Sequence, residues 1–321
     1  MSDPGVPAVR PLRIAVTGAS GLIGTALVPH LRRRGHDVVR LVRRATAAAD
    51  EVRWEPGAPG GVDLAGLGHL DAAVHLAGAG VGDRRWTPAY KREIVASRVD
   101  GTTTLARALA AMHPRPAVLV SASAIGFYGD TGERSVDESA PQADTFLAGV
   151  VRAWEAAADP ARAAGIRVVH PRTGLLLSPR GGALGRLLPL LRLGLGGPLG
   201  SGGQFWSWIT MADEVAALTF LVERDGLAGP VNLTAPHPER NRDVVAALAH
   251  ALRRPAVLPV PAAALRLVLG EFAGEVLASQ RVLPAALSGA GFTFRHPGIG
   301  AAAADLVAGA PAEPPAGDTL A

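Results

Sequence analysis

The chain has 321 residues, 48% hydrophobic and 19% charged, which is enough for one large α/β domain or two joined lobes and excludes a disordered protein. The formal charge is +4, but the 31 arginines are scattered instead of gathered with aromatic residues on one face, so we expect no nucleic-acid partner. The absence of cysteine excludes disulfides, thiolate metal sites and cysteine nucleophiles, and it suits a reducing compartment.

No segment has the pattern of a signal peptide or a membrane span. The first residues lack an apolar stretch, and the most apolar later run, residues 256–270, is interrupted by Pro259, Pro261 and Arg266. We therefore expect a cytoplasmic protein with no membrane partner.

Strands and helices alternate over about the first 180 residues. Apolar runs at 12–18, 36–44, 70–78, 117–126 and 165–177 predict strands, and apolar residues at helical spacing predict helices at 22–35, 96–112 and 144–158. The alternation predicts an α/β fold with a Rossmann-type doubly wound parallel sheet.

The composition changes after residue 177. Residues 178–204 are rich in glycine and proline around a leucine-rich helical middle, which suits a lid. We predict a Rossmann domain over 11–177, to which 207–235 returns, and a smaller C-terminal substrate lobe made of 178–206 and 236–308. Residues 1–10 and 309–321 are expected to be disordered tails.

Three glycines, Gly18, Gly21 and Gly24, lie between the first predicted strand and helix. A turn this tight needs residues without a Cβ, and a bound pyrophosphate needs free backbone N–H groups at a helix N-terminus. At the first strand-to-helix junction of an alternating chain, the triplet predicts dinucleotide binding more than a tight turn alone.

The end of the second predicted strand indicates which dinucleotide is bound. An acidic residue there would bind the ribose 2′-hydroxyl of NAD, whereas arginine accommodates the 2′-phosphate of NADP. The sequence has Arg43 and Arg44 at this point and no acid before Asp50. We therefore predict NADP(H) in preference to NAD(H); the other interpretation is that both arginines are solvated surface residues.

The segment TGASGLIG resembles the glycine loop of the extended short-chain dehydrogenase/reductases. The segments SASAIGFYGD, FLAGVVRAWEAAA and RLGLGGPLGSGGQFWSWI narrow the resemblance to its atypical, epimerase-labelled YfcH-like branch with a DUF1731-type C-terminal region. The resemblance extends from Leu12 to Val307. It implies a cofactor-binding Rossmann fold and oxidoreductase activity on a small molecule of unknown identity.

By this resemblance the glycine loop holds the pyrophosphate, the second strand ends at the adenosine ribose, and a later strand ends at the nicotinamide. The implied cofactor contacts are Gly18, Ser20, Gly21, Leu22, Ile23, Gly24, Val42, Arg43, Arg44, Leu76, Ala77, Gly78, Glu93, Arg98, Ser121, Pro171, Arg172 and Thr173. For Glu93 an exposed helix acid paired with a nearby arginine is the other interpretation.

The wider family places a tyrosine and a lysine four residues apart in the helix predicted here at 144–158. The lysine makes the tyrosine a usable acid or base near neutral pH by lowering its pKa. The corresponding residues are Phe146 and Val150, or one residue later Leu147 and Val151, and none of them ionises. The usual proton transfer is therefore excluded at this position.

Other members of the family's catalytic set are partly retained. Ser123 stands where the resemblance places the catalytic serine or threonine, while Arg98 replaces a relay asparagine. Arg98, Arg172 or Ser123 could polarise a carbonyl, and Tyr128 could donate a proton. We take Ser123 and Tyr128 as the candidate catalytic residues, with a structural serine and a pocket-wall tyrosine as the other interpretations.

The remaining polar residues give weaker signals. His75 lies in an apolar strand and is expected to be a core residue, whereas His170 could reach the nicotinamide. Asp137 and Glu138 are expected to cap a loop or face solvent. No spacing of histidine and acidic residues indicates a metal site.

An aromatic segment near 204–208 is the candidate substrate pocket. Flat rings beside a cofactor favour an apolar or ring-shaped ligand, although they could equally pack the two lobes together. The pocket residues are Gln204, Phe205, Trp206 and Trp208.

Three functions remain open. The leading one is an NADP-dependent oxidoreductase of atypical mechanism acting on a small molecule. The alternatives are a non-catalytic NADPH-binding sensor or regulatory protein and, third, a sugar-nucleotide epimerase or dehydratase. The family resemblance also makes a homodimer an expectation.

Overall fold

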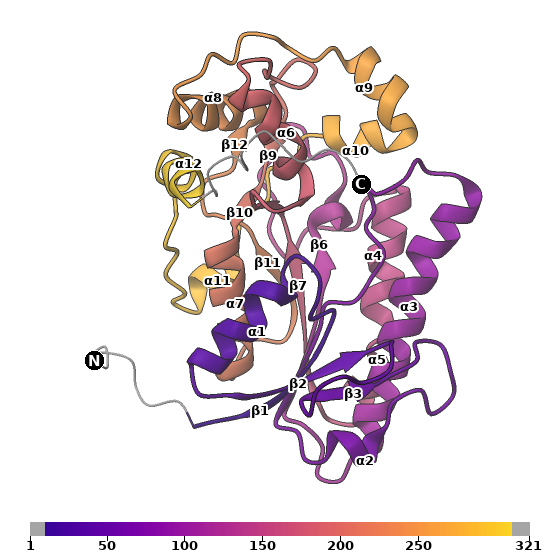
Figure 1. Ribbon diagram of the computed structural model, residues 1–321. Coiled ribbons are helices and arrows are strands. Elements are labelled where there is room, and N and C mark those ends of the chain that lie inside the picture. The colour runs from indigo at the N-terminus through magenta and orange to yellow at the C-terminus, as the bar shows by residue number, and fades with distance from the viewer. Residues whose placement is uncertain (1–9, 310–321) are drawn as a thin grey trace, which may run out of the picture.

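The computed structural model describes residues 10–309 and is built around a parallel sheet (Figure 1). The sheet runs in the order β11-β7-β5-β4-β1-β2-β3, with every neighbouring pair parallel and β6 beside the end of β7. Its strands are β1 (Arg13–Thr17), β2 (Asp37–Val42), β3 (Glu51–Arg53), β4 (Ala72–His75), β5 (Val118–Ser121), β6 (Ser123–Ala124), β7 (Arg167–Thr173) and β11 (Gly229–Leu233). The predicted α/β Rossmann-type sheet is confirmed.

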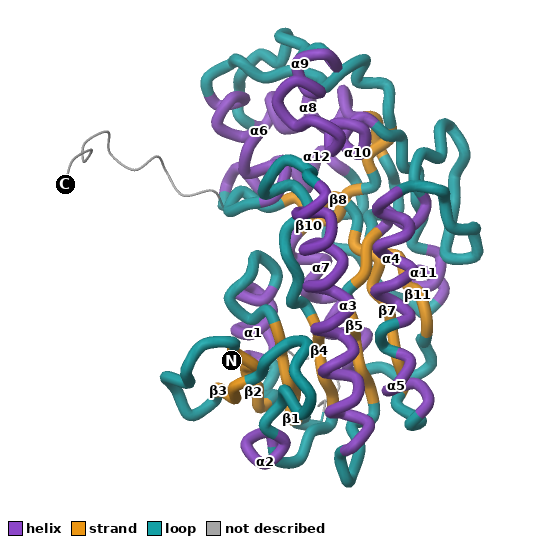
Figure 2. Tube along the Cα trace, turned by 90° about the vertical axis from the view of Figure 1, so that its right-hand side faces the viewer, coloured by secondary structure: helices purple, strands orange, loops and turns teal. Residues whose placement is uncertain are grey.

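Helices cover both faces of the sheet, which is why its central strands are apolar along their whole length. The helices α1 (Gly24–Arg33) and α7 (Met211–Glu223) pack on one face. The other face, seen in Figure 2, carries α3 (Pro88–Ala111), α4 (Phe146–Ala156) and α5 (Asp159–Ala163), with α2 (Leu64–Leu67) at its lower end. α3 begins earlier than predicted because Thr87 caps it by accepting from the Tyr90 amide.

A second group of elements lies beyond the carboxyl ends of the strands, at the top of Figure 1. Its own core includes Leu188, Leu191, Trp208 and Val245. A Cβ on Gly181 would contact the Leu22 side chain at 3.3 Å, so this lobe approaches the glycine loop directly. Its elements are β8 (Leu175–Leu177), α6 (Gly182–Arg192), β9 (Phe205–Trp206), β10 (Trp208–Thr210), β12 (Glu239–Arg240), α8 (Asn241–Ala251), α9 (Ala262–Leu269), η2 (Gly270–Phe272), α10 (Ala273–Leu277) and α12 (Ile299–Ala308).

The predicted lobe boundary is wrong for one segment. The short helix α11 (Ala285–Gly289) lies against β11, and Leu287 belongs to the same buried cluster as β1 and α7. Phe292 and Phe294 pack on that cluster as well. The chain therefore returns to the Rossmann core late in the sequence before α12 rejoins the C-terminal lobe. Of the predicted tails at 1–10 and 309–321, residues 1–9 and 310–321 lie outside the described residues.

No helix within residues 10–309 is both long and apolar enough to cross a membrane.

Candidate cofactor site

The glycine loop connects β1 to α1 and is packed too closely for side chains at two of its three glycines. Gly18 has φ +66°, and a Cβ on it would lie 2.7 Å from the Leu76 carbonyl carbon. A Cβ on Gly24 would collide with the Gly18 carbonyl oxygen. On Gly21, by contrast, a Cβ would meet only that oxygen, at 3.2 Å, so its outer side is open.

The open side of this loop presents unused backbone donors. Within residues 10–309 the amides of Ser20, Leu22, Ile23 and Gly24 donate to no backbone or side-chain acceptor. α1 also has no capping side chain and no acid in its first turn. Free amides at the positive end of a helix form an anion site, so the loop suits a pyrophosphate.

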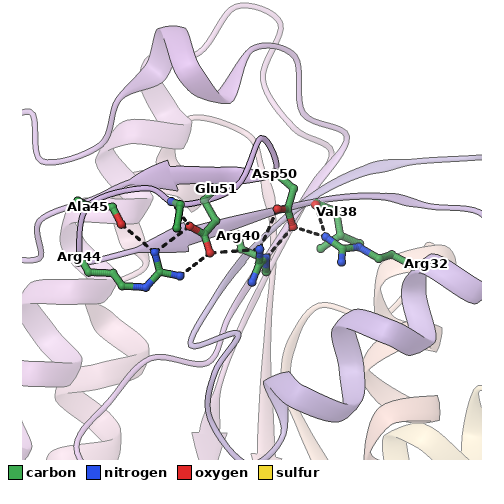
Figure 3. Close-up of polar contacts among 8 residues, drawn as sticks. Arg32, Val38, Arg40, Arg44, Ala45, Asp50 and Glu51 are labelled. Carbon is green, nitrogen blue, oxygen red and sulfur yellow. Dashed lines mark hydrogen bonds and ion pairs between the residues drawn. The ribbon is translucent and has the colours of Figure 1, made fainter.

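The end of β2 carries a chain of ion pairs, drawn in Figure 3. Arg40 donates to Asp50 from Nε at 2.6 Å and from Nη2 at 2.8 Å, and Arg32 binds the same carboxylate. Glu51 accepts from Arg44 at 2.5 and 2.8 Å, and Arg40 lies 3.1 Å from it. The arginines hold the pKa of Asp50 far below its ordinary range and lower that of Glu51 to about 2.

These pairs distinguish the two arginines predicted to bind the cofactor. Arg44 is engaged by Glu51, whereas Arg43 is exposed and forms no hydrogen bond or ion pair within the described chain. Asp50 and Glu51, the acids nearest the strand end, are neutralised by three arginines, Arg32, Arg40 and Arg44. The surface beside Val42 is therefore cationic. Two exposed guanidinium groups there have no partner within residues 10–309, that of Arg43 and that of Arg53, which lies opposite Val42 in the sheet.

The segment after β4 is held in place by a threonine. The Thr17 hydroxyl oxygen accepts from the amides of Leu76 and Ala77, at 3.1 and 3.3 Å, and lies 2.7 Å from His75 Nδ1. Since that oxygen is already an acceptor, its proton points to His75. Burial lowers the pKa of His75 to about 4, so the ring is neutral and serves the core, as expected from the sequence.

A buried polar network joins β6, η1 (Ile125–Tyr128), α4 and β7. Glu155 on α4 accepts from Arg172 Nε and Nη2, at 2.8 and 2.9 Å, and from the Ser123 hydroxyl at 2.7 Å. Arg172 Nη1 donates to the Tyr128 hydroxyl, which in turn donates to Asn232 Oδ1 at 2.8 Å.

This network limits what the two candidate catalytic residues can do. The Ser123 proton is directed at Glu155, so the hydroxyl can accept from a substrate but not polarise its carbonyl. The Tyr128 hydroxyl is bonded on both sides, its residue is 5% exposed, and burial raises its pKa. In this arrangement the Tyr128 proton is engaged by Asn232 and is not directed at a substrate.

Glu155 and Asn232 were not predicted. The only signal for Glu155 is that it is the one acid inside an apolar helix. Nothing local marks Asn232, because its role depends on β11 lying next to β7.

The other residues predicted at the nicotinamide end are buried to different degrees. Ser121 is fully buried and its hydroxyl has no partner within residues 10–309. Pro171 is buried and pairs with Val231 across the sheet. Thr173 donates to Glu214 on α7 at 2.8 Å. Burial raises the pKa of Glu214 to about 8, a shift that no sequence pattern indicated.

The two predicted contacts on α3 differ sharply. Glu93 is exposed and lies 3.4 Å from Arg84, which is the ordinary helix-surface pair considered as its other interpretation. Arg98 is buried, with Nη1 donating to the carbonyl oxygens of Ala79 and Ile94.

His170 and the acids near 137 also take structural places. His170 is buried, and its Nε2 lies 3.1 Å from Arg162 Nη2 of α5. Asp137 caps its own loop through Ser139, as predicted. Glu138 instead accepts from the Asn232 and Ala286 amides and ties α11 to the sheet, which corrects the expectation of a cap or solvent-facing acid.

The predicted pocket wall is mostly core. Trp208 is fully buried in the C-terminal lobe, and the Gln204 side chain donates to the Leu199 carbonyl oxygen. The centre of the Phe205 ring lies 4.5 Å from Arg240 Cζ and 4.6 Å from Arg281 Cζ, so both guanidinium groups contact this ring. Of the four residues only Trp206 keeps partial exposure, and it packs on the core of the C-terminal lobe together with Trp208.

Within residues 10–309, no group of three or more histidine, aspartate or glutamate side chains could hold a metal ion.

Comparison with known proteins agrees with this geometry. Residues 14–233 match the NAD dependent epimerase/dehydratase family, and residues 260–306 match a domain of unknown function, DUF1731. The chain belongs to the NAD dependent epimerase/dehydratase family. The resemblance inferred from the glycine loop and the C-terminal segments is confirmed.

Relatives in this family match over nearly their whole length. The epimerase family protein Mb2239 of Mycobacterium bovis is 46% identical over 290 residues, which cover 90% of this chain and 95% of the relative. The human epimerase family protein SDR39U1 is 35% identical over 303 residues, covering 92% and 100%.

Two solved structures from the family are similar. A crystal structure of human SDR39U1 with NADPH has a TM-score of 0.84 at 33% identity and covers 93% of this chain and 100% of that one. A nucleoside-diphosphate sugar epimerase from Corynebacterium glutamicum has a TM-score of 0.76 at 37% identity, covering 93% of this chain and 59% of that one.

Proposed function

We propose that the chain binds NADP(H) in preference to NAD(H) and acts as an oxidoreductase on a small, uncharged or weakly polar molecule. The single observation that carries the cofactor choice is the free, exposed Arg43 beside a strand end whose acids are already paired. The relative crystallised with NADPH supports the same choice.

The cofactor would be held by this chain's own groups at successive strand ends. The open amides from Ser20 to Gly24 would bind the pyrophosphate, and Arg43 would bind the 2′-phosphate. Residues 76–78 would pass beneath the adjoining ribose. When bound, NADPH supplies a hydride that a positioned carbonyl can accept.

The missing tyrosine and lysine define the mechanism that we propose. Glu155 and Arg172 would fix the floor of the site, with Ser123 and Tyr128 bonded to them, so these two hydroxyls position the network instead of transferring protons. A substrate oxygen would receive its proton from water, since no acid on α4 is available. This makes acceptors that are readily reduced without a strong protein acid the favoured substrate class.

The second candidate is an NADPH-binding sensor without turnover. A specific observation favours it: the Ser123, Tyr128, Glu155 and Arg172 side chains satisfy one another, leaving no proton carrier directed at a substrate. The sugar-nucleotide epimerase or dehydratase comes third, because those reactions require the proton transfer that α4 cannot perform.

The first test is a titration of the purified protein with NADPH and NADH, read by nicotinamide fluorescence. Incubation of the NADPH complex with a panel of carbonyl compounds follows. Tighter NADPH binding and oxidation by at least one compound are expected. Tight binding with no oxidation across the panel would favour the sensor, and no binding would end both proposals.

We also propose a cytoplasmic homodimer. The outer surfaces of α3 and α4 form a hollow in which Val95, Val99 and Phe146 are partly exposed. A second copy could cover these side chains in the manner common to the family. Sedimentation equilibrium of wild type and Val99→Asp tests it: a dimer that the substitution dissociates is expected, and a monomeric wild type would refute it.

A further inference from the structure

The C-terminal lobe exposes aliphatic side chains on a surface that neither the cofactor site nor the hollow between α3 and α4 uses. Within residues 10–309 eight large hydrophobic side chains are exposed, and seven of them belong to this lobe. Five of the seven come from two segments, the end of α6 with the turn after it and the loop between α8 and α9. These five, here called the aliphatic patch, are 44–73% exposed: Leu190, Leu193, Leu195, Val257 and Leu258.

The two segments lie side by side in the lobe at the top of Figure 2. The Val260 amide donates to the Pro198 carbonyl oxygen at 2.9 Å. A Cβ on Gly194, in the turn after α6, would lie 3.5 Å from the Pro255 ring. The aliphatic side chains of the two segments therefore share one surface.

The fold of the lobe does not account for the leucines on the outer face of α6. Its inner face is already buried, with Leu184, Leu188 and Leu191 in the core of the lobe. The outer face of a surface helix is normally polar. Here it carries Leu190 and, at the C-terminal end, Leu193, which are three residues apart and so lie on the same side.

The patch is bordered by unpaired arginines. Arg192 lies in the last turn of α6, and Arg253 and Arg254 follow the end of α8. Their guanidinium groups form no hydrogen bond or ion pair with the rest of the described chain. Across residues 178–212 and 244–270 the sequence has six arginines and no aspartate or glutamate. The surface is therefore apolar and cationic at the same time.

This combination distinguishes between the possible occupants. A second copy seated on the same patch would bring three unpaired cations against three others, which opposes association. The five exposed side chains are all aliphatic, whereas the centres of protein interfaces are enriched in aromatic residues. Aliphatic groups beside free arginines suit a bilayer of anionic lipids, because the first enter the acyl boundary and the second meet the phosphates.

We propose that the aliphatic patch and its three arginines dock on the surface of a bilayer that contains anionic phospholipids. Such a contact needs no spanning helix, and the expectation of no membrane partner considered spanning segments alone. Since α6 has 11 residues and begins beside Leu22 of the glycine loop, the bilayer would lie about 16 Å from the cofactor site. Molecules dissolved in the lipid would then be close to that site.

Cosedimentation with lipid vesicles tests the proposal with the full chain and without cofactor, so the result is independent of the proposed function. The vesicles are phosphatidylcholine alone, or equal parts of phosphatidylcholine and phosphatidylglycerol. The wild type should bind the anionic vesicles, bind the neutral ones at least tenfold more weakly, and lose affinity as the salt concentration rises.

Two double variants separate the apolar and the cationic contributions. Leu193→Asp with Val257→Asp places charges where aliphatic groups would enter the bilayer, and should weaken binding to anionic vesicles more than tenfold. Arg253→Gln with Arg254→Gln removes two phosphate contacts and should weaken it about tenfold or more. All four side chains are exposed, so the variants should keep the melting temperature of the wild type.

Matched controls come from exposed residues of the Rossmann domain. Leu64→Asp on α2, and Arg33→Gln with Arg107→Gln on α1 and α3, should change vesicle binding by no more than about twofold. Equal losses in these controls, equal binding to neutral and anionic vesicles, or no binding to either would overturn the proposal. A wild-type oligomer that Leu193→Asp dissociates in the absence of lipid would also overturn it, because the occupant would then be a second copy.

Discussion

Replacing Arg43 by alanine tests cofactor choice with little risk to the fold. The side chain is exposed and bonds to nothing in the described chain, so its removal should leave the melting temperature nearly unchanged. A 2′-phosphate carries close to two negative charges and strong acceptor oxygens. The loss should therefore appear in NADPH binding and not in NADH binding.

The magnitude follows from exposure. A hydrogen bond to a charged group contributes about 1.5 to 3 kcal/mol, and screening at an exposed site favours the lower end. About 1.5 kcal/mol corresponds to a roughly tenfold weaker NADPH complex. Raising the ionic strength should reduce the difference between wild type and Arg43→Ala, because the interaction is between exposed charges.

Fluorescence titration with both cofactors at low and high salt measures these quantities. Arg33→Ala is the charge-matched control, since Arg33 is also exposed but lies in the last turn of α1, away from the glycine loop. Equal losses of NADPH and NADH affinity, or a loss as large in Arg33→Ala, would refute the assignment of Arg43 to the phosphate.

Three further predictions follow from the packing. Gly21→Ala should fold normally but lose NADPH affinity, whereas Gly24→Ala should lower the melting temperature because its Cβ collides with the Gly18 carbonyl. Thermal unfolding and NADPH titration of both variants test this. Equal melting temperatures would contradict the packing. Glu155→Gln leaves buried Arg172 unpaired and should cost about 3 kcal/mol of unfolding free energy in urea at pH 7. That loss should shrink in acid. The pKa of Glu155 is lowered in the folded state, so its ion pair stabilises the fold above the unfolded pKa, and this stability disappears as the pH falls through the folded pKa. A loss of unfolding free energy that stays constant with pH would count against the pair. The folded pKa of Glu214 is raised to about 8, so between its unfolded pKa and pH 8 the folded state holds a proton that the unfolded state has lost. The free energy of unfolding should therefore fall by about 1.4 kcal/mol for each unit by which the pH rises in that range. Urea unfolding from pH 5 to 8 should show a shallower fall in Glu214→Gln, and parallel curves for the two proteins would refute the shift.

The sequence predicted the parts of the site that depend on backbone geometry. The spacing of Gly18, Gly21 and Gly24 at a strand-to-helix junction predicts the loop, because only residues without a Cβ allow that approach. The alternation of apolar strand-like and helix-like runs likewise predicts a doubly wound parallel sheet. These signals are local, so they can be read along the chain.

The polar network could not be predicted in the same way. Its five connected side chains come from β6, η1, α4, β7 and β11, and Asn232 is more than a hundred residues from Tyr128. Whether a hydroxyl faces a cleft or another side chain depends on those long-range contacts. The aromatic segment at 205–208 has the same ambiguity, because the wall of a cleft and the core of a lobe have the same composition.

The apolar face of α4 is better explained by its neighbours than by simple loss of a catalytic pair. Phe146 stands 5.1 Å from Trp86, ring centre to ring centre, and Trp86 stands 5.5 Å from Phe272 of η2. The chain's single lysine, Lys91, lies 4.8 Å above the Phe146 ring and is paired with Glu271. At the position where the family resemblance implied a tyrosine, this helix therefore begins with an aromatic contact to the C-terminal lobe.

The aromatic contact of α4 with the C-terminal lobe also bears on the absence of a lysine from this helix. A tyrosine acid needs an adjacent cation, and a cation at Val151 would have to be desolvated beside the buried Trp154. Without a tyrosine at the start of the helix, a lysine at position 151 would carry the desolvation cost and would have no phenol to activate. On α3, by contrast, the Arg98 guanidinium is already held by two backbone carbonyl oxygens and the Trp154 ring. The buried side of α4, with Val151 and Trp154, then contributes packing alone.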